Sequence, residues 1–253
     1  MAWFERAPVR IRYEEYGSGE PVLLLPGLGG RIEELQGVID ALSPEFRVVA
    51  ADLPGSGRSE PIPRAYTADY YEDDAHTFAS FVSEVIGGPA HLVGFSDGGE
   101  VALLMAIQDP SVARTVAVWG AAGSLPEEAA GMVAAMGDLI EHAPPGMEGF
   151  RDYFVGAYGE ENARQTTRSL SAAMAEMVAR GGSLARDRAG DIACPVLLIA
   201  GEHDELAPPG VVRDLAGRIT GATFAIASDA GHGVSWDQPA WLNRTLLAFL
   251  EAH

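Results

Sequence analysis

The sequence predicts one α/β domain, a mostly parallel sheet with helices on both faces and a helical segment inserted into it. Segments with helical spacing alternate with short apolar runs, which implies β-α-β units with right-handed crossovers. A length of 253 residues suits one such domain with a modest insertion. Six of the apolar runs end in glycine or polar residues, as strands buried on both faces of a parallel sheet do. They are PVLLLPG, FRVVAADLPG, AHLVGFS, VARTVAVWG, PVLLIAGEHD and ATFAIAS.

The segments expected to be helical lie between or after these strands. They span residues 31–42, 66–86, 98–108, 210–219 and 239–251. The N-terminal stretch PVRIRYEEYG instead alternates in character from residue to residue. That alternation predicts an antiparallel strand at the edge of the sheet.

One long segment, 124–190, breaks the alternation of strands and helices. It is acidic, has helical spacing and lacks strand signals. We therefore expect residues 1–123 and 191–253 to form the core and 124–190 to form an inserted helical lid. Most large apolar side chains of this segment should pack it onto the core, and the remainder should line the leaving-group side of a pocket. These side chains are Met132, Met136, Met147, Phe150, Tyr153, Phe154, Tyr158, Met174 and Met177.

The composition excludes several classes of function. Acidic residues number 36 against 17 basic ones, and the net charge of -19 would repel the phosphates of a nucleic acid. Every basic residue is arginine, which excludes a lysine nucleophile, a Schiff base and pyridoxal chemistry. The single cysteine, Cys194, excludes an internal disulfide and a cysteine metal cluster. We expect no cofactor and no metal.

The expected cellular setting follows from what the chain lacks. Its first residues, MAWFERAPVR, do not have the basic segment and apolar run of a signal peptide. No stretch approaches the roughly 20 apolar residues of a membrane helix. We expect a soluble cytoplasmic protein without a membrane partner, and the sequence leaves a homo-oligomer open.

The stretch LVGFSDGGEVALL contains the candidate nucleophile, Ser96, in a G-x-S-x-G pattern. The pattern follows a predicted strand and opens a predicted helix, which is the setting that a nucleophile elbow requires. Gly94 and Gly98 flank the serine and let the strand and the helix pass closely. The competing interpretation is an ordinary turn serine.

A serine hydroxyl needs a base, and the base needs an acid that orients it. Asp204 lies just past a predicted strand in LLIAGEHDELAPP, with Glu202 and Glu205 as substitutes. His232 lies in a glycine-flanked loop before the last helix, in DAGHGVSWDQP. The order Ser, Asp, His at strand ends predicts a catalytic triad.

Acyl transfer also needs hydrogen-bond donors for the oxyanion, and backbone N–H groups on rigid turns supply them. The stretch LLLPGLGG follows a buried strand, so we assign the N–H of Leu28 together with that of Asp97. A dinucleotide-binding interpretation of GLGG fails because Ile32 stands where the last glycine of G-x-G-x-x-G belongs. The stretch DLPGSGRS is best interpreted as a structural turn rather than an anion site at Arg58.

The motifs PGLGG, DLPGSGRS, GFSDGG, GEHDELAP and AGHG resemble, in order and spacing, those of the α/β-hydrolase superfamily. GFSDGG together with VAVWGAAG is similar to the biphenyl-hydrolase-like, or valacyclovirase, group of serine hydrolases. This resemblance implies the α/β-hydrolase fold, a catalytic serine and a preference for α-amino acid esters. It also implies that Asp97 pairs with the substrate's ammonium. The chain departs from many relatives in having proline before the oxyanion glycine, and its lid does not align with the group's lid.

We therefore expect a serine esterase that acts on a small-molecule ester through an acyl-enzyme. One alternative is a carbon-carbon bond hydrolase or enol-lactonase with the same triad, which would prefer anionic substrates. Another is a non-hydrolytic ligand-binding receptor, because the fold does not fix the function. For Asp97 the alternative is a carboxylate that only contacts backbone or solvent.

Overall fold

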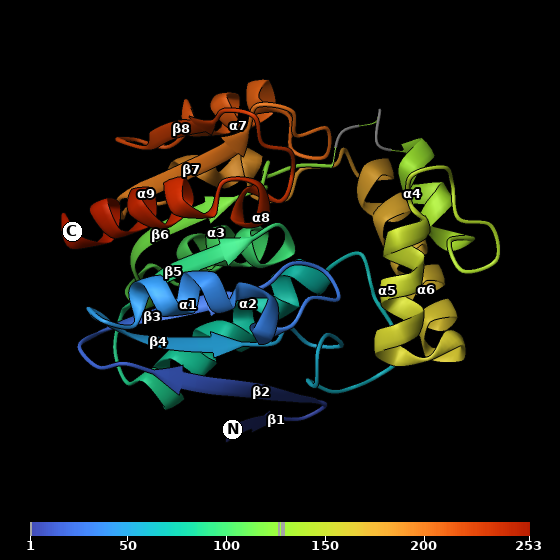
Figure 1. The fold of residues 1–253 in the computed structure, drawn as a ribbon, viewed down its shortest axis with the longest axis horizontal. Helices are drawn as coiled ribbons and strands as arrows, with labels where there is room; N and C mark the ends of the chain where they lie inside the picture. Colours follow the sequence, from blue (N-terminus) through green and yellow to red (C-terminus); the bar gives the residue numbers. More distant parts are fainter. Residues whose placement is uncertain (1, 126, 128–129) are drawn as a thin grey trace.

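A computed structural model describes residues 2–125, 127 and 130–253. These residues form an eight-stranded sheet in the order β1-β2-β4-β3-β5-β6-β7-β8 (Figure 1). The strands from β4 to β8 in this order are parallel, and β1 and β2 join them antiparallel. The predicted mostly parallel sheet is thus confirmed. The strands are β1 (Ala2–Arg6), β2 (Val9–Tyr16), β3 (Glu20–Leu25), β4 (Phe46–Ala51), β5 (Ala90–Phe95), β6 (Ala113–Trp119), β7 (Val196–Gly201) and β8 (Thr223–Ala227).

The prediction that the alternating N-terminal strand lies at the edge of the sheet was wrong. That strand is β2, and it pairs with β4 on one side and with β1 on the other. The outer strand β1 has no regular alternation, although Phe4 reaches the core. A five-residue strand without a periodic pattern gives no local signal, and it forms because the following hairpin brings it alongside β2.

Helices cover both faces of the sheet (Figure 1). On one face lie α1 (Gln36–Leu42), α8 (Val234–Asp237) and α9 (Pro239–Glu251). On the other lie α2 (Tyr70–Phe81), α3 (Asp97–Gln108) and α7 (Pro209–Ala216). Successive residues of a strand point to opposite faces, so Leu23 packs into the second layer and Leu24 into the first. Both layers are apolar, which explains why the inner strands are continuously hydrophobic.

Short helices of other types complete the two layers. A 3-10 turn, η1 (Ile32–Leu35), leads into α1, and a π-helical turn, η2 (Val82–Ile86), extends α2. Two more 3-10 turns, η3 (Pro110–Val112) and η5 (Arg186–Asp191), precede β6 and β7. No described helix is both long enough and apolar enough to cross a membrane.

The helices α4 (Ala130–Gly137), α5 (Glu148–Tyr158) and α6 (Glu160–Ala179) form a separate layer beyond the carboxyl ends of the strands (Figure 1). We call these three helices the helical insert. An antiparallel bridge between Ser124 and Ser183 joins the two chain segments that lead to and from it. Residues 126 and 128–129 of the expected lid lie outside the described residues. That the segment acts as a lid stays a prediction, whereas its position over the strand ends is a feature of the structure.

Candidate active site

Ser96 lies in the sharp turn between β5 and α3, with φ 51° and ψ -118°, a conformation that is strained for a residue with a side chain. Its N–H donates to the carbonyl of Trp119 on the neighbouring strand β6, 2.9 Å away. A Cβ added to Gly94 would lie 2.3 Å from the Gly98 carbonyl oxygen, and one added to Gly98 would lie 2.5 Å from that of Pro26. Close backbone contacts therefore require glycine on both sides of the serine.

The structure brings the three predicted triad residues together. Nε2 of His232 lies 3.0 Å from Oγ of Ser96. Nδ1 of the same ring lies 3.0 Å and 3.1 Å from the two carboxylate oxygens of Asp204. With Nδ1–H donating to this carboxylate, the lone pair of Nε2 faces the serine hydroxyl, as a general base requires.

Asp204 is held rigidly below the histidine. It is buried, and its Oδ1 accepts from the N–H groups of Leu206 and Ala207, each at 2.9 Å. The two substitutes considered from the sequence, Glu202 and Glu205, are exposed. Among these three carboxylates, the position beside His232 is thus occupied by Asp204.

The two predicted oxyanion donors lie in the same place. Leu28 and Asp97 line the cavity next to Ser96. A Cβ on Gly27 would lie 3.2 Å from Cβ of Ser96, so the loop before Leu28 passes directly against Ser96. Asp97 is the first residue of α3, where backbone N–H groups have no partner within the helix. One of these residues thus lies in the loop after β3 and the other at the start of α3, and both are next to Ser96.

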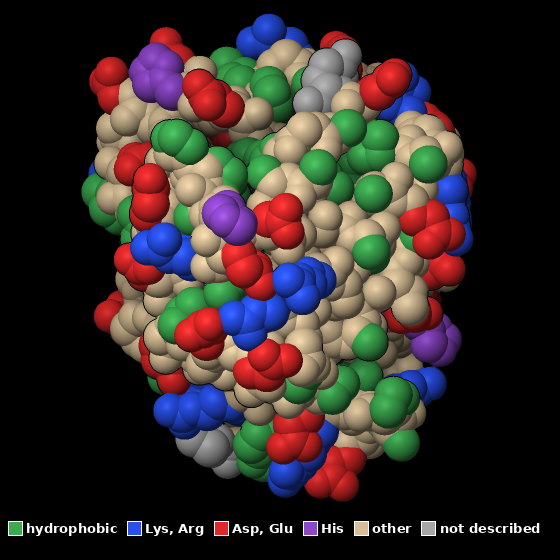
Figure 2. Space-filling model, turned by 90° about the vertical axis from the view of Figure 1, so that its right-hand side faces the viewer, with side chains coloured by type: hydrophobic (Ala, Val, Ile, Leu, Met, Phe, Trp, Pro, Cys, Tyr) green, Lys and Arg blue, Asp and Glu red, His purple; other side chains and the backbone are tan. Residues whose placement is uncertain are grey.

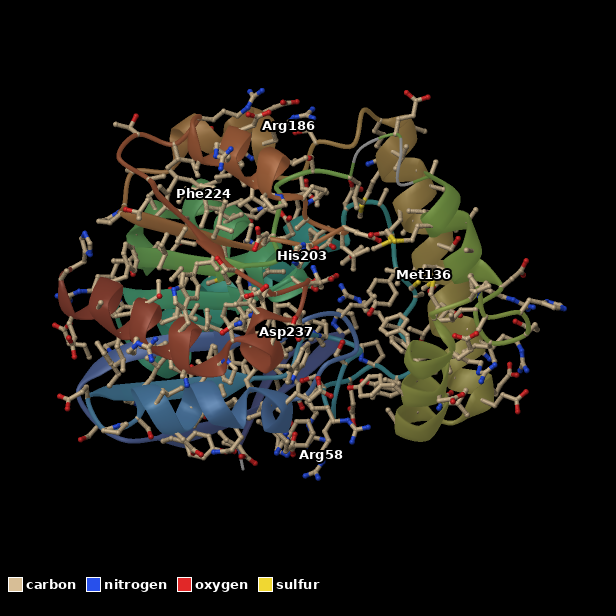
Figure 3. The ribbon with its side chains drawn as sticks, turned by 45° about the horizontal axis from the view of Figure 1, so that its top comes forward. Arg58, Met136, Arg186, His203, Phe224 and Asp237 are labelled. Carbon is tan, nitrogen blue, oxygen red and sulfur yellow. The ribbon has the colours of Figure 1, made fainter. Side chains whose placement is uncertain are left out.

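A cavity of about 620 Å³ opens above Ser96, between the strand ends and the helical insert. Six of the nine large apolar side chains named from the sequence of the insert line it. The expectation that only a minority of them would line the pocket was therefore wrong, although Met136, Met147, Phe150 and Met174 also pack on the core. Met136 is one of the lining side chains, and it lies on the side of the insert that faces the core (Figure 3). The six are Met132, Met136, Met147, Phe150, Tyr153 and Met174.

The Asp97 carboxylate is buried at one side of this cavity. Its Oδ1 accepts hydrogen bonds from the hydroxyls of Tyr70 at 3.0 Å and Tyr71 at 2.9 Å. Its Oδ2 accepts none from another described residue. Burial raises the pKa of Asp97, while the two tyrosine hydroxyls and His232 lower it. The two tyrosines were missed by sequence reasoning, which placed only their helix.

Glu100, one turn further along α3, also lines the cavity. Its Oε1 accepts from the N–H groups of Ala122 and Gly123, each at 2.8 Å. Burial raises the pKa of Glu100 to about 7, against the effect of these two donors. On the opposite side, Glu34 accepts a hydrogen bond of 2.6 Å from the Tyr153 hydroxyl.

The ionisable side chains around the cavity, tyrosines aside, are mainly acidic. Apart from His232, those among the described lining residues are Glu34, Asp97 and Glu100, and none is an arginine. The side chains that can offer a negative charge to a ligand in this apolar cavity are therefore carboxylates.

One further group of polar side chains lies outside the cavity lining. Glu202, His203 and Asp229 are exposed, and their potential metal-ligating atoms lie within 4.8 Å of one another. His203 is thus a surface residue. It lies near the carboxyl end of β7 (Figure 3).

Comparison with known proteins finds similar sequences and similar structures. The chain is 27% identical over 247 residues to serine hydrolase BPHL of Mus musculus. The aligned region covers 96% of this chain and 84% of that protein. Its structure is similar to that of the enol-lactonase from Burkholderia xenovorans LB400, with a TM-score of 0.78 and 23% identity over 99% of this chain and 100% of the other. It is also similar to a thermophilic esterase from Thermogutta terrifontis, with a TM-score of 0.74 and 23% identity over 98% and 96% of the two chains.

The match to a family model covers most of the chain, from residue 22 to residue 245. It includes every strand from β4 to β8 and each of the residues discussed at the cavity. The fold predicted from the motifs is therefore confirmed, and so is the resemblance to the biphenyl-hydrolase-like serine hydrolases. This chain is a hydrolase and belongs to the alpha/beta hydrolase family.

Proposed function

We propose that the protein is a serine hydrolase that cleaves small carboxylic esters, with a preference for α-amino acid esters. The observation that carries the proposal is the continuous contact from Asp204 through His232 to Ser96, with both joining distances near 3.0 Å. It occurs at the base of a cavity large enough for a small molecule. These are the parts that acyl transfer through a serine requires.

In the proposed mechanism, Nε2 of His232 takes the proton of Ser96 as Oγ attacks the ester carbonyl carbon. The carbonyl oxygen becomes an oxyanion, and the N–H groups of Leu28 and Asp97 stabilise it. His232 then donates the proton to the leaving alcohol, and the acyl group stays on Ser96. A water molecule, deprotonated by the same histidine, releases the acid and restores the serine.

The preference for amino acid esters rests on Asp97. Oδ2 of this carboxylate accepts no hydrogen bond from another described residue, and Asp97 lines the cavity. The ammonium of an α-amino acid ester is one carbon away from the reacting carbonyl. A carboxylate directly after the nucleophile is therefore well placed to pair with it.

Two other functions considered from the sequence have less support. A carbon-carbon bond hydrolase or enol-lactonase would use the same triad, but the acidic lining of Glu34, Asp97 and Glu100 disfavours anionic substrates. A non-hydrolytic receptor would not require the contact between His232 and Ser96. Labelling of Ser96 by a fluorophosphonate probe separates a hydrolase from a receptor.

The first test is Ser96→Ala. We expect it to abolish ester turnover with the fold intact, as judged by circular dichroism. Adding His232→Ala to this variant should cost little more, because the triad acts as a unit. Near wild-type turnover by purified Ser96→Ala protein would contradict the mechanism.

The second test is Asp97→Asn, which keeps the backbone N–H and removes the charge. A lost charge-assisted hydrogen bond of roughly 1.5 to 3 kcal/mol corresponds to about a 10- to 150-fold fall in kcat/KM for amino acid esters. The matched desamino esters should change little. Equal losses for both kinds of ester would assign Asp97 a structural role.

The pH profile supplies a third test. The substrate ammonium loses its proton above a pH of about 7.7, so kcat/KM for amino acid esters should fall on the alkaline side. Desamino esters should reach a plateau there. Identical profiles for the two ester types would argue against amine recognition.

A further inference from the structure

We propose that Tyr70 and Tyr71 are positioning residues of an ammonium site on the acyl side of the cavity, acting by binding one oxygen of Asp97 and leaving the other free for the substrate. This inference rests on the proposed function, because it concerns how Asp97 binds an amine. It assigns a role to two residues of α2 that do not belong to the triad or the oxyanion turn.

The geometry at Asp97 is asymmetric. Both tyrosine hydroxyls donate to Oδ1, at 3.0 Å and 2.9 Å, so both lone pairs of this oxygen are used. Oδ2 accepts nothing from another described residue. The carboxylate is thereby fixed in one rotation, with a single acceptor oxygen available to a ligand.

The convergence of the two tyrosines is unusual for neighbours on a helix, whose side chains normally diverge. Here Tyr70 is the first residue of α2, and its ring stacks on that of Tyr71 with centroids 4.1 Å apart. Because Tyr70 is the first residue of α2, no preceding turn of the helix crowds its side chain, and its ring can lie against that of Tyr71. Both tyrosines are buried, each 3% exposed, so their hydroxyls contact Asp97 in the interior of the protein.

The two hydroxyls also favour the charged form of Asp97. Burial raises the pKa of this carboxyl, and hydrogen bonds from Tyr71 and Tyr70 lower it. Without them the carboxyl would hold its proton to a higher pH and would lose its attraction for an ammonium group. Other ionisable groups that lie close to Asp97 or to the two tyrosines come from α2, α3 and the loops that pack on them. They are Arg64, Tyr66, Asp74, Glu100 and His232.

Tyr71 contributes in a second way. It lines the cavity beside Asp97, so an ammonium group on Oδ2 lies next to an aromatic ring. Aromatic faces attract cations that have been removed from water. Tyr71→Phe keeps this ring, so the effect of that substitution on amine binding reports the hydroxyl alone.

The test uses Tyr70→Phe, Tyr71→Phe and the double variant in the full-length protein. Each is assayed with an amino acid ester and its desamino counterpart, and the ratio of the two kcat/KM values is followed against pH. Ionisations of the enzyme that affect the turnover of both esters equally, such as that of the catalytic base, cancel in this ratio. We expect the double variant to lose about tenfold or more in the ratio near neutral pH, and the acidic limb of the ratio to move to higher pH.

Tyr66→Phe is the matched control. Tyr66 packs edge-on against Tyr70, with centroids 4.9 Å apart, and belongs to the same aromatic cluster. No hydrogen bond joins it to Asp97 among the described residues. Its ratio and the position of its acidic limb should match those of the wild-type protein.

The outcomes separate the two proposals. A selective loss in Asp97→Asn with an unchanged ratio and limb in the tyrosine variants would overturn the role of Tyr70 and Tyr71 alone. Equal losses for both esters in Asp97→Asn would overturn the proposed amine preference itself. Turnover of the desamino ester reports folded enzyme in each variant, and if the double variant fails to fold, Tyr71→Phe decides the matter.

Discussion

The two glycines that flank Ser96 leave no room for a side chain, because neighbouring backbone atoms lie too close. The Cβ of an alanine at 98 would lie 2.5 Å from the Pro26 carbonyl oxygen, so α3 or the loop before Leu28 must move. We expect Gly98→Ala to lower the free energy of unfolding by about 1 to 3 kcal/mol and to reduce turnover. Urea denaturation measures the first effect. Gly88→Ala, where nothing lies within 4 Å, should stay within about 0.5 kcal/mol of wild type.

The buried carboxyl of Glu100 should make stability depend on pH. Burial raises its pKa from 4.5 to about 7, so the folded state binds this proton more tightly than the unfolded state does. The free energy of unfolding therefore falls as pH rises between these values, by up to about 3 kcal/mol, and the contribution is constant above them. Other groups titrate in the same range. The contribution of Glu100 is therefore measured as the difference in the free energy of unfolding between the wild-type protein and a variant without this carboxyl.

Glu100→Gln provides that difference, because it keeps an oxygen for the N–H groups of Ala122 and Gly123. We expect its stability relative to wild type to increase from about pH 5 to about pH 8. Urea unfolding at the two pH values measures it. A stability difference that does not vary with pH would show that Glu100 is ionised throughout.

Among the elements, α5 is tied to the loop that carries Leu28. The Tyr158 hydroxyl donates to the Gly29 carbonyl at 2.5 Å and accepts from the Gly57 N–H at 2.8 Å. The Tyr153 hydroxyl lies 2.7 Å from the same carbonyl oxygen. Phe154 packs against Gly29 and is fully buried. The helical insert thus holds the turn that supplies one of the proposed oxyanion donors.

Tyr158→Phe should lower kcat for every ester, with or without an amine. The substitution removes the hydrogen bonds of this hydroxyl to Gly29 and Gly57. Loss of the one that holds the Leu28 turn, of about 1 kcal/mol, corresponds to roughly a fivefold effect. Steady-state kinetics with both ester types checks this, and Tyr16→Phe, on strand β2, serves as a distant control. A fall confined to amino acid esters would show that α5 acts on acyl recognition instead.

Local sequence signals were sufficient for residues at strand ends. Ser96 and His232 each have a glycine-flanked turn, and Asp204 follows a clear strand, so it could be predicted that these three residues lie together. Tyr70 and Tyr71 could not, because they reach Asp97 from 27 and 26 residues away through the packing of α2 on α3. The same limit applies to the insert, where helical spacing shows which side chains share a face but not whether that face meets a core or a cavity.

At the scale of the whole molecule, the net charge is -19. Figure 2 shows acidic side chains spread over the face formed by the insert, with arginines among them. Such a surface attracts a cationic substrate, and salt screens the attraction. We expect kcat/KM for amino acid esters to fall several-fold between about 20 mM and about 500 mM sodium chloride, while neutral desamino esters change less than about twofold. A parallel decline for both would indicate a general salt effect on the enzyme.

The order of the strands has a consequence for the life of the nascent chain. Ser96 follows β5 in the middle of the sheet, and its base lies 136 residues later, after the outermost strand β8. On the ribosome, the serine turn is synthesised long before Asp204 and His232. Under the proposed mechanism a chain that has not yet reached His232 holds an inactive nucleophile. Ester cleavage then requires that the chain has been synthesised through His232 and that β8 has docked on the sheet.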